Sequence, residues 1–480
     1  MKKSKLSLGL AFIVSLLALA SCGENGKGDS DELWICAYDG GYGSTWIENA
    51  ASDFEEKTGT KVHFDLDTSI LDRIESALKD GGDYDIYFSH DIKWQNYAAE
   101  GLLASLDDVY SSTIEGTGKT FADRTVRGAN ENSKAMGADE QEHYFKACWT
   151  QGAGGFVYNM DMFEQNGWNV PTTYAELETL CATINSANIK SSTGATVRPF
   201  AWSGSDREYY WDYPVLEWWA QLAGIEKVDT VLQYLGPTGK YADGYEMYNP
   251  NTYYKEFIEA YSMWHSLIAE NATNSIKNAY STGLNTAKSA FVSGEAAMIP
   301  YAQWAKFELE QVADNEELDF NIAMMETPKA KADSKNFNYM VGFGDSIIIP
   351  ENATQKDKAK DFLKYLATYD ACKNFVKDSH GSFLAFDYKD VDMSDIESKD
   401  TYIKSIHDKL NNSTNFSVLS KNPISYRTVN AVMPWPNNNY YYKNACAEPS
   451  KYTAQIVGEK VYTTAKTNWK TWLRTANLSD

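Results

Sequence analysis

Long apolar runs are scarce in this chain of 480 residues. The most apolar stretch, from Leu6 to Ala20, is shorter than the roughly 20 residues that a membrane-spanning helix needs. No later run approaches that length, which argues against a multi-span membrane protein. We therefore expect the chain beyond this stretch to fold in water.

Several catalytic and cofactor motifs are also missing. The sequence has no Gly-x-Ser-x-Gly elbow and no Walker motif, which argues against that type of serine hydrolase and against a built-in ATPase. Its six histidines are scattered and show no metal-ligand spacing. We expect no metal, no cofactor and no enzymatic activity.

Cysteine is rare, with six in the whole chain, and none forms a C-x-x-C pair. Apart from Cys22 the number is odd, so at least one thiol stays free if the others pair. Cys36 lies in an apolar strand pattern, which is typical of a small buried residue. No disulfide framework is predicted.

Positive charge is also in short supply. Lys and Arg number 44 against 66 Asp and Glu, for a formal net charge of −22. This balance argues against nucleic acid and against anionic membrane surfaces as partners. A solvated acidic surface is the simplest explanation, and a cationic ligand is the alternative.

Aromatic residues are plentiful, with 14 Trp and 32 Tyr. Sugars present apolar C–H faces that stack on rings, and hydroxyls that need directed polar partners. This richness in Trp and Tyr favours a carbohydrate-binding cleft.

The N-terminus has the pattern of an export signal. Lys2, Lys3 and Lys5 precede the apolar stretch, and small residues follow it, so residues 1–21 are predicted to be a signal peptide. The ending LALASC resembles the lipobox of bacterial lipoproteins, which implies cleavage before Cys22 and its lipidation. Residues 22–30 are polar and glycine-rich, as in a flexible tether. The expected location is the extracytoplasmic side of a cell membrane, either the outer face of a monoderm or the periplasmic side of a diderm bacterium. Plain secretion is the alternative.

The next hundred residues alternate between strand and helix patterns. Residues 32–38, 61–66 and 84–88 are apolar enough for strands, and residues 46–57 and 71–79 carry apolar side chains at helical spacing. Such alternation predicts right-handed crossovers and a largely parallel sheet.

One later stretch, Phe291 to Trp304 (FVSGEAAMIPYAQW), combines a helix end, a strand and an aromatic residue that follows the strand. Gly294 and Glu295 end a helix, residues 296–299 form a buried strand, and Pro300 is predicted to stop it. Trp304 then follows the strand's carboxyl end, where α/β sheets bind ligands. It offers a flat plate for a sugar ring; the alternative is that it packs the start of the next helix.

These segments resemble maltose-binding protein and its relatives, the family 1 extracellular solute-binding proteins of ABC importers. The similar stretches are LWICAYDGGYG with FEEKTGTKV, YDIYFSHD with YAAEGLLASL, FVSGEAAMIPYAQW, and MVGFGDSIIIPENATQKDKAKDFLKYLATYDA. Their order and spacing cover nearly the whole chain after the leader.

The resemblance implies an α/β fold of two lobes, periplasmic-binding-protein-like class II. Each lobe would be a mainly parallel sheet flanked by helices, and a multi-strand hinge would join them. Lobe one would comprise residues 31–150 and 328–388, and lobe two residues 151–327 and 389–480. The implied partners are a carbohydrate and the permease subunits of an ABC importer, with the protein itself a monomer.

The resemblance also implies a set of ligand-binding residues. Asp39 and Asp91 match cleft carboxylates, Glu208 matches a cleft glutamate, and Tyr210 and Trp304 match stacking aromatics. Further candidates are Tyr42 and Trp94 in the loops after the first and third strands, Trp149 near the first crossover between the lobes, and Trp435 and Tyr441 in the C-terminal stretch MPWPNNNYYY, which resembles the family's last cleft segment loosely. Gly40 stands where the maltose binder has a lysine, and an arginine beside Asp91 is not kept, which argues against the same sugar bound in the same way.

Other interpretations stay open from the sequence alone. Asp39 and Asp91 would also serve as helix caps. A glycoside hydrolase would carry similar aromatics and carboxylates. The same fold would suit an oligopeptide, a polyamine or another cation, and a purely structural surface lipoprotein is a further alternative.

Overall fold

A computed structural model of the chain describes residues 32–480, except 127, 314–316, 429–432 and 479–480. The predicted signal peptide 1–21, the lipidation site Cys22 and the tether 22–30 lie outside the described residues. Among the residues that the structure describes, no helix combines the length and the apolar character needed to cross a bilayer.

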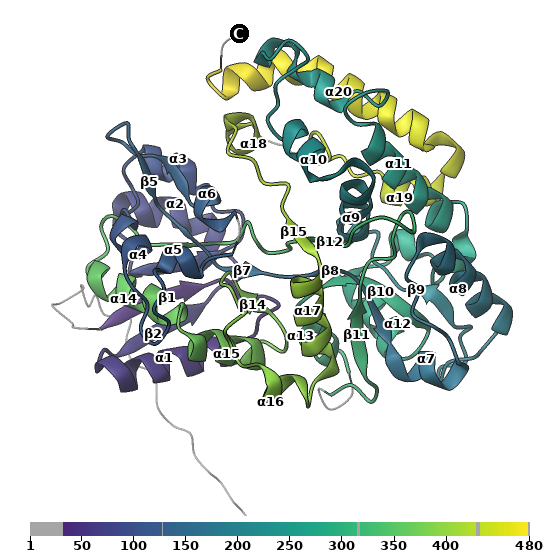
Figure 1. Ribbon diagram of the computed structural model, residues 1–480, viewed down its shortest axis with the longest axis horizontal. Coiled ribbons are helices and arrows are strands. Elements are labelled where there is room, and N and C mark those ends of the chain that lie inside the picture. The colour runs from purple at the N-terminus through teal and green to yellow at the C-terminus, as the bar shows by residue number, and fades with distance from the viewer. Residues whose placement is uncertain (1–31, 127, 314–316, 429–432, 479–480) are drawn as a thin grey trace, which may run out of the picture. The chain divides into compact units, whose positions relative to one another are not determined.

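The first sheet has five strands in the order β2–β1–β3–β13–β6 (Figure 1). Their bounds are β1 (Leu33–Ala37), β2 (Val62–Leu66), β3 (Ile86–Ser89), β6 (Ala147–Cys148) and β13 (Ser346–Ile348). The three predicted strands and the two intervening helices of residues 32–88 are confirmed within one to two residues at most ends.

Helices cover both faces of the first sheet. Because successive strand residues point to opposite faces, Ile35 and Phe88 join the core that includes α1 and α14, whereas Cys36 and Tyr87 join the core that includes α2 and α3. The helices around this sheet are α1 (Thr45–Thr58), α2 (Ile70–Asp80), α3 (Trp94–Ala99), α4 (Asp107–Ser111), α5 (Phe121–Arg124), α6 (Ala129–Asn132), α14 (Lys356–Leu366) and α15 (Tyr369–Asp378).

The second sheet has four strands in the order β11–β8–β10–β9, and with its helices it makes the other lobe. The strands are β8 (Gly154–Asn159), β9 (Arg198–Phe200), β10 (Ala296–Ala302) and β11 (Ile322–Met325). Helices associated with this half are α7 (Met160–Asn166), α8 (Tyr174–Ala187), α9 (Asp212–Ala223), α10 (Ile225–Val231), α11 (Lys255–Trp264), α12 (Leu284–Val292), α13 (Ala305–Glu310), α17 (Thr401–Asn412), α19 (Tyr442–Ala447) and α20 (Ala454–Thr475).

The predicted two-lobe α/β fold is confirmed, but the sheets are mixed rather than mainly parallel. In the first sheet β13 runs antiparallel to both of its neighbours, and in the second sheet β8 runs antiparallel to both of its own. Both strands follow segments that pass between the sheets, so they enter their sheet from the opposite end. The strand–helix alternation of residues 32–88 gives no information about strands that enter a sheet after crossing from the other one.

The expectation that Pro300 ends its strand is wrong. β10 continues to Ala302, and Pro300 pairs with Phe156 of β8. On the other side of β10, β9 ends opposite Met298. The backbone nitrogen of Pro300 faces that side, so the proline removes no ladder hydrogen bond there.

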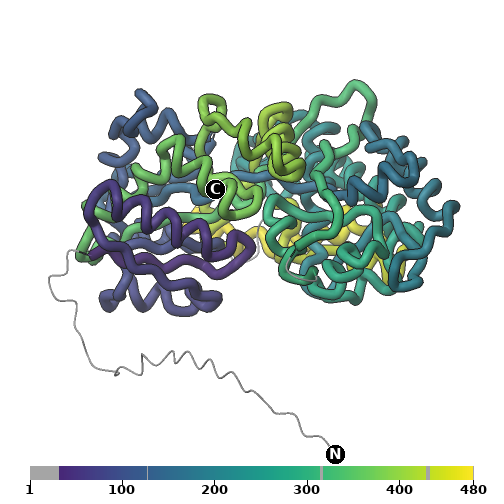
Figure 2. The backbone as a smooth tube through the Cα atoms, turned by 90° about the horizontal axis from the view of Figure 1, so that it is seen from below, coloured from purple at the N-terminus to yellow at the C-terminus, as the bar shows by residue number. Residues whose placement is uncertain are grey.

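Two short pairs of strands lie where the polypeptide passes between the sheets. β7 (Thr150–Gln151) pairs with β14 (Phe383–Leu384), and β12 (Phe337–Tyr339) pairs with β15 (Thr414–Phe416). Figure 2 shows the N-terminal segments on one side and the teal segments on the other, with green segments between them. These pairs fit the predicted hinge, and the lobe boundaries 31–150 with 328–388 and 151–327 with 389–480 stay predictions.

A buried ion pair ties the elements next to these crossings. Lys409 of α17 and Glu217 of α9 are both essentially inaccessible, with Nζ 2.9 Å from Oε2. The Lys409 ammonium also donates to the carbonyl of Gly154, at 2.8 Å, and the Glu217 carboxylate accepts from the backbone N–H of Tyr339, at 2.9 Å. The pair therefore joins two helices to β8 and β12.

Replacing Lys409 with methionine is expected to lower the free energy of unfolding by about 3–5 kcal/mol, because Glu217 is left buried without its counter-ion. Lys404, on the same helix, pairs with Asp408 at an exposed position and supplies the control. Lys404→Met is expected to cost less than about 1 kcal/mol. Urea denaturation of both variants checks this, and equal losses would contradict the proposed role of burial.

Candidate functional site

Segments from both lobes surround one cavity of about 520 Å³. From the first-sheet side come the loop after β1, the loop after β3 and the segment 341–345; from the second-sheet side come residues 207–213, Trp304 and Glu308. The ring-bearing residues that line it are Tyr38, Tyr42, His90, Trp149, Tyr209, Tyr210, Tyr213, Trp304, Tyr339, Phe343 and Tyr440. The size is within the range of small-molecule sites, roughly 300–1,000 Å³.

The topology explains why these loops meet. β1 and β3 are parallel neighbours, so the loops that follow them leave the same edge of the first sheet. The first loop contributes Tyr42, and the second contributes His90 and Asp91. Asp91 has a φ of 52°, a left-handed conformation that non-glycine residues adopt rarely and that recurs at ligand sites.

Two aromatic residues form one wall of the cavity. Tyr210 lies in the 3₁₀ turn Glu208–Trp211, and Trp304 follows the end of β10. The indole Nε1 of Trp304 donates to the hydroxyl of Tyr210 at 3.4 Å, and the ring centroids are 6.4 Å apart. This contact holds two ring systems at 64° to each other, which offers a ligand two differently directed apolar faces.

Tyr42 and Trp149 lie together on another side. Their ring centroids are 4.9 Å apart, and the Tyr42 hydroxyl lies 2.9 Å from the Thr150 hydroxyl and donates to Asp345 at 3.3 Å. The Trp149 ring is buried, and its Nε1 has no hydrogen-bond partner among the described residues. Trp149 thus supports the cavity from beneath and keeps an unused donor.

Five of the tyrosines that line the cavity have hydroxyls without a hydrogen-bond partner in the described part of the chain, namely Tyr38, Tyr209, Tyr213, Tyr339 and Tyr440. Neighbouring rings pack against three of them. The ring centroids of Tyr210 and Tyr213 are 5.2 Å apart, and those of Tyr209 and Tyr440 are 5.7 Å apart. Rings fixed by packing with free hydroxyls are well placed to donate to or accept from a polar ligand.

Two carboxylates of the cavity have unusual acidities. Burial raises the pKa of Asp345 to about 7 and that of Asp212 also to about 7. Asp212 accepts from the Trp435 indole and from the Tyr442 hydroxyl, each at 2.7 Å. Each carboxyl is therefore able to donate as well as accept a hydrogen bond near neutral pH.

His90 and Asp91 form a third polar group at the cavity. The imidazole Nδ1 is 3.0 Å from the carboxylate, which raises the pKa of His90 and lowers that of Asp91. The Asp91 side chain is 87% exposed, so its carboxylate is open to a ligand.

The predicted site residues separate into two groups. Tyr42, Asp91, Trp149, Tyr210 and Trp304 line this one cavity, although they come from distant parts of the chain. The remaining candidates do not line it: Asp39, Trp94, Glu208, Trp435 and Tyr441.

Each outlying candidate has its own environment. Asp39 is exposed beside the lining residues Tyr38 and Gly40. Trp94 lines a neighbouring cavity of about 420 Å³, with the Lys146 ammonium 5.2 Å from its ring. These two stay candidates for the margins of the site.

The other three belong to the packing behind the cavity. Glu208 accepts from the backbone N–H of Lys443 at 2.7 Å, so it ties α19 to the 3₁₀ turn. The Trp435 ring is buried, and its indole N–H donates a hydrogen bond to Asp212. The ring centroids of Tyr441 and Trp435 are 5.6 Å apart. Their contribution is to position the lining residues.

Sequence reasoning missed several lining residues. The charged or titratable lining residues that it did not select are His90, Arg207, Asp212, Glu308 and Asp345. His90 adjoins Asp91, and Arg207 precedes Glu208, so proximity to the chosen residues was the available signal. Nothing in the sequence indicates that Glu308, on α13, approaches the loop after β1.

Asp212 gives the protein a predicted pH dependence. Because its folded-state pKa is about 7 and its unfolded value is near 3.8, this group favours the folded state below about pH 4 and loses that contribution as the pH rises through 7. Asp212→Asn keeps an acceptor for Trp435 and Tyr442. We expect the melting temperature of the variant, relative to the original, to rise from about pH 4 to about pH 8. A constant difference in thermal denaturation scans would contradict this.

Within residues 32–480, apart from the gaps named above, no group of three or more His, Cys, Asp or Glu side chains is arranged to hold a metal ion. The lining residues instead supply ring faces, hydroxyls and carboxylates.

A family model described as bacterial extracellular solute-binding protein matches residues 39–371. The chain belongs to this family. The match runs from the loop after β1 into α15 and so includes every strand of the second sheet and every strand of the first sheet except β1. The two-lobe fold is that of a solute-binding protein, and the family consists of binding proteins rather than enzymes. Comparison with curated proteins gives no match.

Solved structures share the fold of this solute-binding protein. The apo form of RafE from Streptococcus pneumoniae is 18% identical, with a TM-score of 0.62, covering 93% of this chain and 100% of its own. An ABC transporter solute-binding protein from Thermotoga lettingae, bound with α-D-tagatose, is 17% identical, with a TM-score of 0.61 and coverages of 92% and 100%. Lmo0181 from Listeria monocytogenes, in complex with cycloalternan, is 14% identical, with a TM-score of 0.61 and coverages of 93% and 99%.

Proposed function

We propose that this protein captures a sugar in the 520 Å³ cavity and delivers it to the permease of an ABC importer. The observation that carries the proposal is the joint lining of the cavity by ring faces and free polar groups. Trp304 and Tyr210 offer faces for sugar C–H groups, and Asp91 and the hydroxyls of Tyr213 and Tyr440 offer partners for sugar hydroxyls.

Relatives with the same fold support the sugar assignment. The Thermotoga lettingae protein is bound with α-D-tagatose and Lmo0181 with cycloalternan, both carbohydrates. The present cavity meets the same chemical demand with its own residues. In this proposal the protein binds without chemical change, as a monomer, and the energy for transport comes from a separate ATPase.

Binding is proposed to draw the lobes together around the sugar. The ligand contacts residues from both sheets, such as Tyr42 on one side and Trp304 on the other. A ligand that touches both lobes only in the closed arrangement binds that arrangement more tightly, and this difference in affinity shifts the population toward it. The closed form is then the form that the permease recognises.

A ligand panel read by thermal shift tests the function. Mono- and oligosaccharides, polyamines and short peptides are each added, because a ligand at about 100 times its Kd stabilises the folded state by about 2.7 kcal/mol. We expect a carbohydrate to raise the melting temperature and to be recovered unchanged by chromatography. Stabilisation by polyamines or peptides alone would overturn the sugar assignment, and a released product would indicate a glycoside hydrolase.

Anchoring at Cys22 is a separate part of the proposal. In cells fed labelled fatty acid, the original chain is expected to carry the label and to sediment with membranes, since two or more acyl chains hold a protein there stably. Cys22→Ala is expected to lose the label and leave the membrane fraction. Unlabelled protein, or a variant that stays membrane-bound, would contradict lipidation at this residue.

A further inference from the structure

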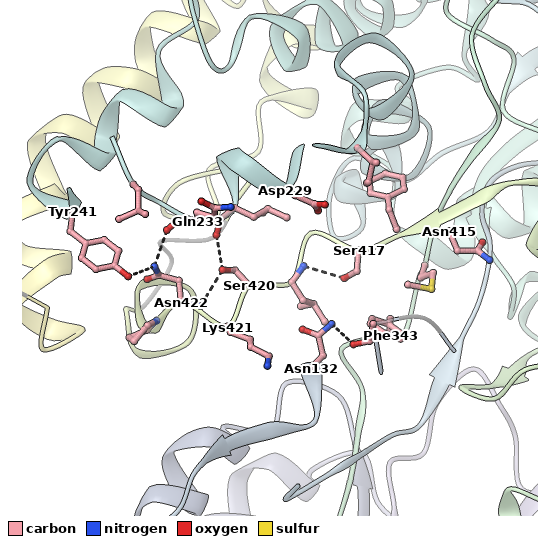
Figure 3. A pocket seen from close by; sticks show the side chains of 18 residues that line it. Asn132, Asp229, Gln233, Tyr241, Phe343, Asn415, Ser417, Ser420, Lys421 and Asn422 are labelled. Carbon is pink, nitrogen blue, oxygen red and sulfur yellow. Dashed lines mark hydrogen bonds between the residues drawn. The ribbon is translucent and has the colours of Figure 1, made fainter. Parts of the chain in front are cut away.

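Figure 3 shows a second cavity, of about 610 Å³. The two cavities share the lining residues Met340, Phe343, Ser417 and Leu419, so they are neighbours on either side of these residues. Each cavity by itself is within the range of a complete small-molecule site, roughly 300–1,000 Å³. The two neighbouring cavities together therefore offer more space than one small ligand requires.

The second cavity has a polar lining of a different kind. Amide and hydroxyl side chains of Asn132, Gln233, Asn415 and Ser417 line it, and they come from α6, from the turn after α10 and from the β15 region. Figure 3 shows them on facing walls, with Asn132 opposite Gln233. Neutral groups that donate and accept in turn match sugar hydroxyls, which do the same.

Leu419 lies where the cavities meet. It is one of the few large apolar side chains that are exposed in the described part of the chain, at 41% of its surface. It lines both cavities and also the neighbouring one that contains Trp94. Exposure of a leucine inside a groove is explained if a ligand with apolar C–H groups covers it.

The segment 417–423 that carries Leu419 is held in place by its own hydrogen bonds. The Ser420 hydroxyl donates to the carbonyl of Leu232 at 2.7 Å, and the Asn422 amide donates to the carbonyl of Gln233 at 2.9 Å. On the facing side the Lys421 ammonium lies 2.8 Å from Glu131. This segment is thus fixed to the turn after α10 and also reaches the α6 region, and its groove wall is formed before a ligand arrives.

We propose that the second cavity is a subsite for additional sugar units, so that the ligand is an oligosaccharide with one end against Trp304 and Tyr210. In this proposal the sugar chain passes over Leu419, and its other end lies among the side-chain amides of Asn132 and Gln233. This inference rests on the proposed sugar-binding function and specifies the substrate class. It assigns to Gln233 a contact that only longer ligands make.

The test compares ligand length with a substitution in the second cavity. Isothermal titration is done with α-1,4-linked and β-1,4-linked glucose series of one to six units, and with the sugars that give a shift in the panel. In the original protein the Kd is expected to fall by about 30-fold or more between the shortest binding sugar and its longer homologues. Gln233→Trp fills the amide-lined cavity and is expected to reduce that gain to about threefold or less.

Gln233 is exposed, so its replacement leaves the core intact. Gln233→Ala is expected to lose part of the gain, and Gln165→Trp, at an exposed position on α7, is expected to keep all of it. A Kd that does not change with length, or an unchanged gain in Gln233→Trp, would overturn the subsite while sugar binding itself stands. Absence of binding by sugars of every length would overturn both the subsite and the proposed function.

Discussion

Replacing Trp304 with alanine is expected to weaken sugar binding by about 30-fold or more, because a central ring in a closed site contributes about 2 kcal/mol or more. The indole lines the cavity from the end of β10 and donates to the Tyr210 hydroxyl. Its removal takes away one ring face and also frees Tyr210 to move. Isothermal titration with the best sugar from the ligand panel measures the loss.

The control for this substitution is Trp168→Ala. Trp168 is half-buried and packs 5.8 Å from Phe163, within the second-sheet lobe and away from the cavity lining. It is expected to lower the melting temperature without changing the Kd. If Trp304→Ala binds sugar as tightly as the original while remaining folded, Trp304 is only a packing residue.

Replacing Gly41 with valine is expected to weaken apparent sugar affinity by about 100-fold. A Cβ at this position would lie 2.9 Å from Trp304 Cβ and 3.0 Å from Glu308 Oε1, so a side chain does not fit between the loop after β1 and α13. If the closed arrangement then falls to about 1% of molecules, the apparent Kd rises by the same factor. The Gly41 backbone itself has an ordinary φ, so the effect comes from the contact between the loop and the helix.

Gly283→Ala is the matched control. The nearest atoms to a Cβ there are 3.7 Å away, an ordinary van der Waals distance. Titration and thermal denaturation are compared for the two variants. Gly41→Val is expected to unfold near the original temperature yet bind weakly, whereas equal affinity in both variants would show that this contact does not limit closure.

Local patterns in the sequence are sufficient for the first three strands and the two helices between them. The strand at residues 33–37 and the helix that ends at Gly59 follow from apolar spacing and a glycine with φ of 73°. The continuation of β10 through Pro300 does not follow, because it depends on β9 ending opposite Met298. The length of a neighbouring strand is a property of the whole sheet.

The candidate site was also predictable only where a residue's role depends on its own segment. Tyr210 and Trp304 were found because a family pattern fixes each of them within its own segment, and they then meet across the cavity. Trp435 was a candidate because its segment loosely resembles the last cleft segment of the family, yet its ring is buried and its indole N–H donates to Asp212. Which face of an aromatic residue turns to the cavity depends on partners more than two hundred positions away, and one sequence does not give those partners.

Hydrogen–deuterium exchange with and without the best-binding sugar tests the central claim most directly, since it reports backbone protection along the whole chain. The account predicts added protection in peptides that contain residues 38–43, 207–213 and 301–308, which belong to both sides of the cavity. Protection confined to one side, or located on surfaces outside the cavity lining, would contradict capture of the sugar between the two lobes.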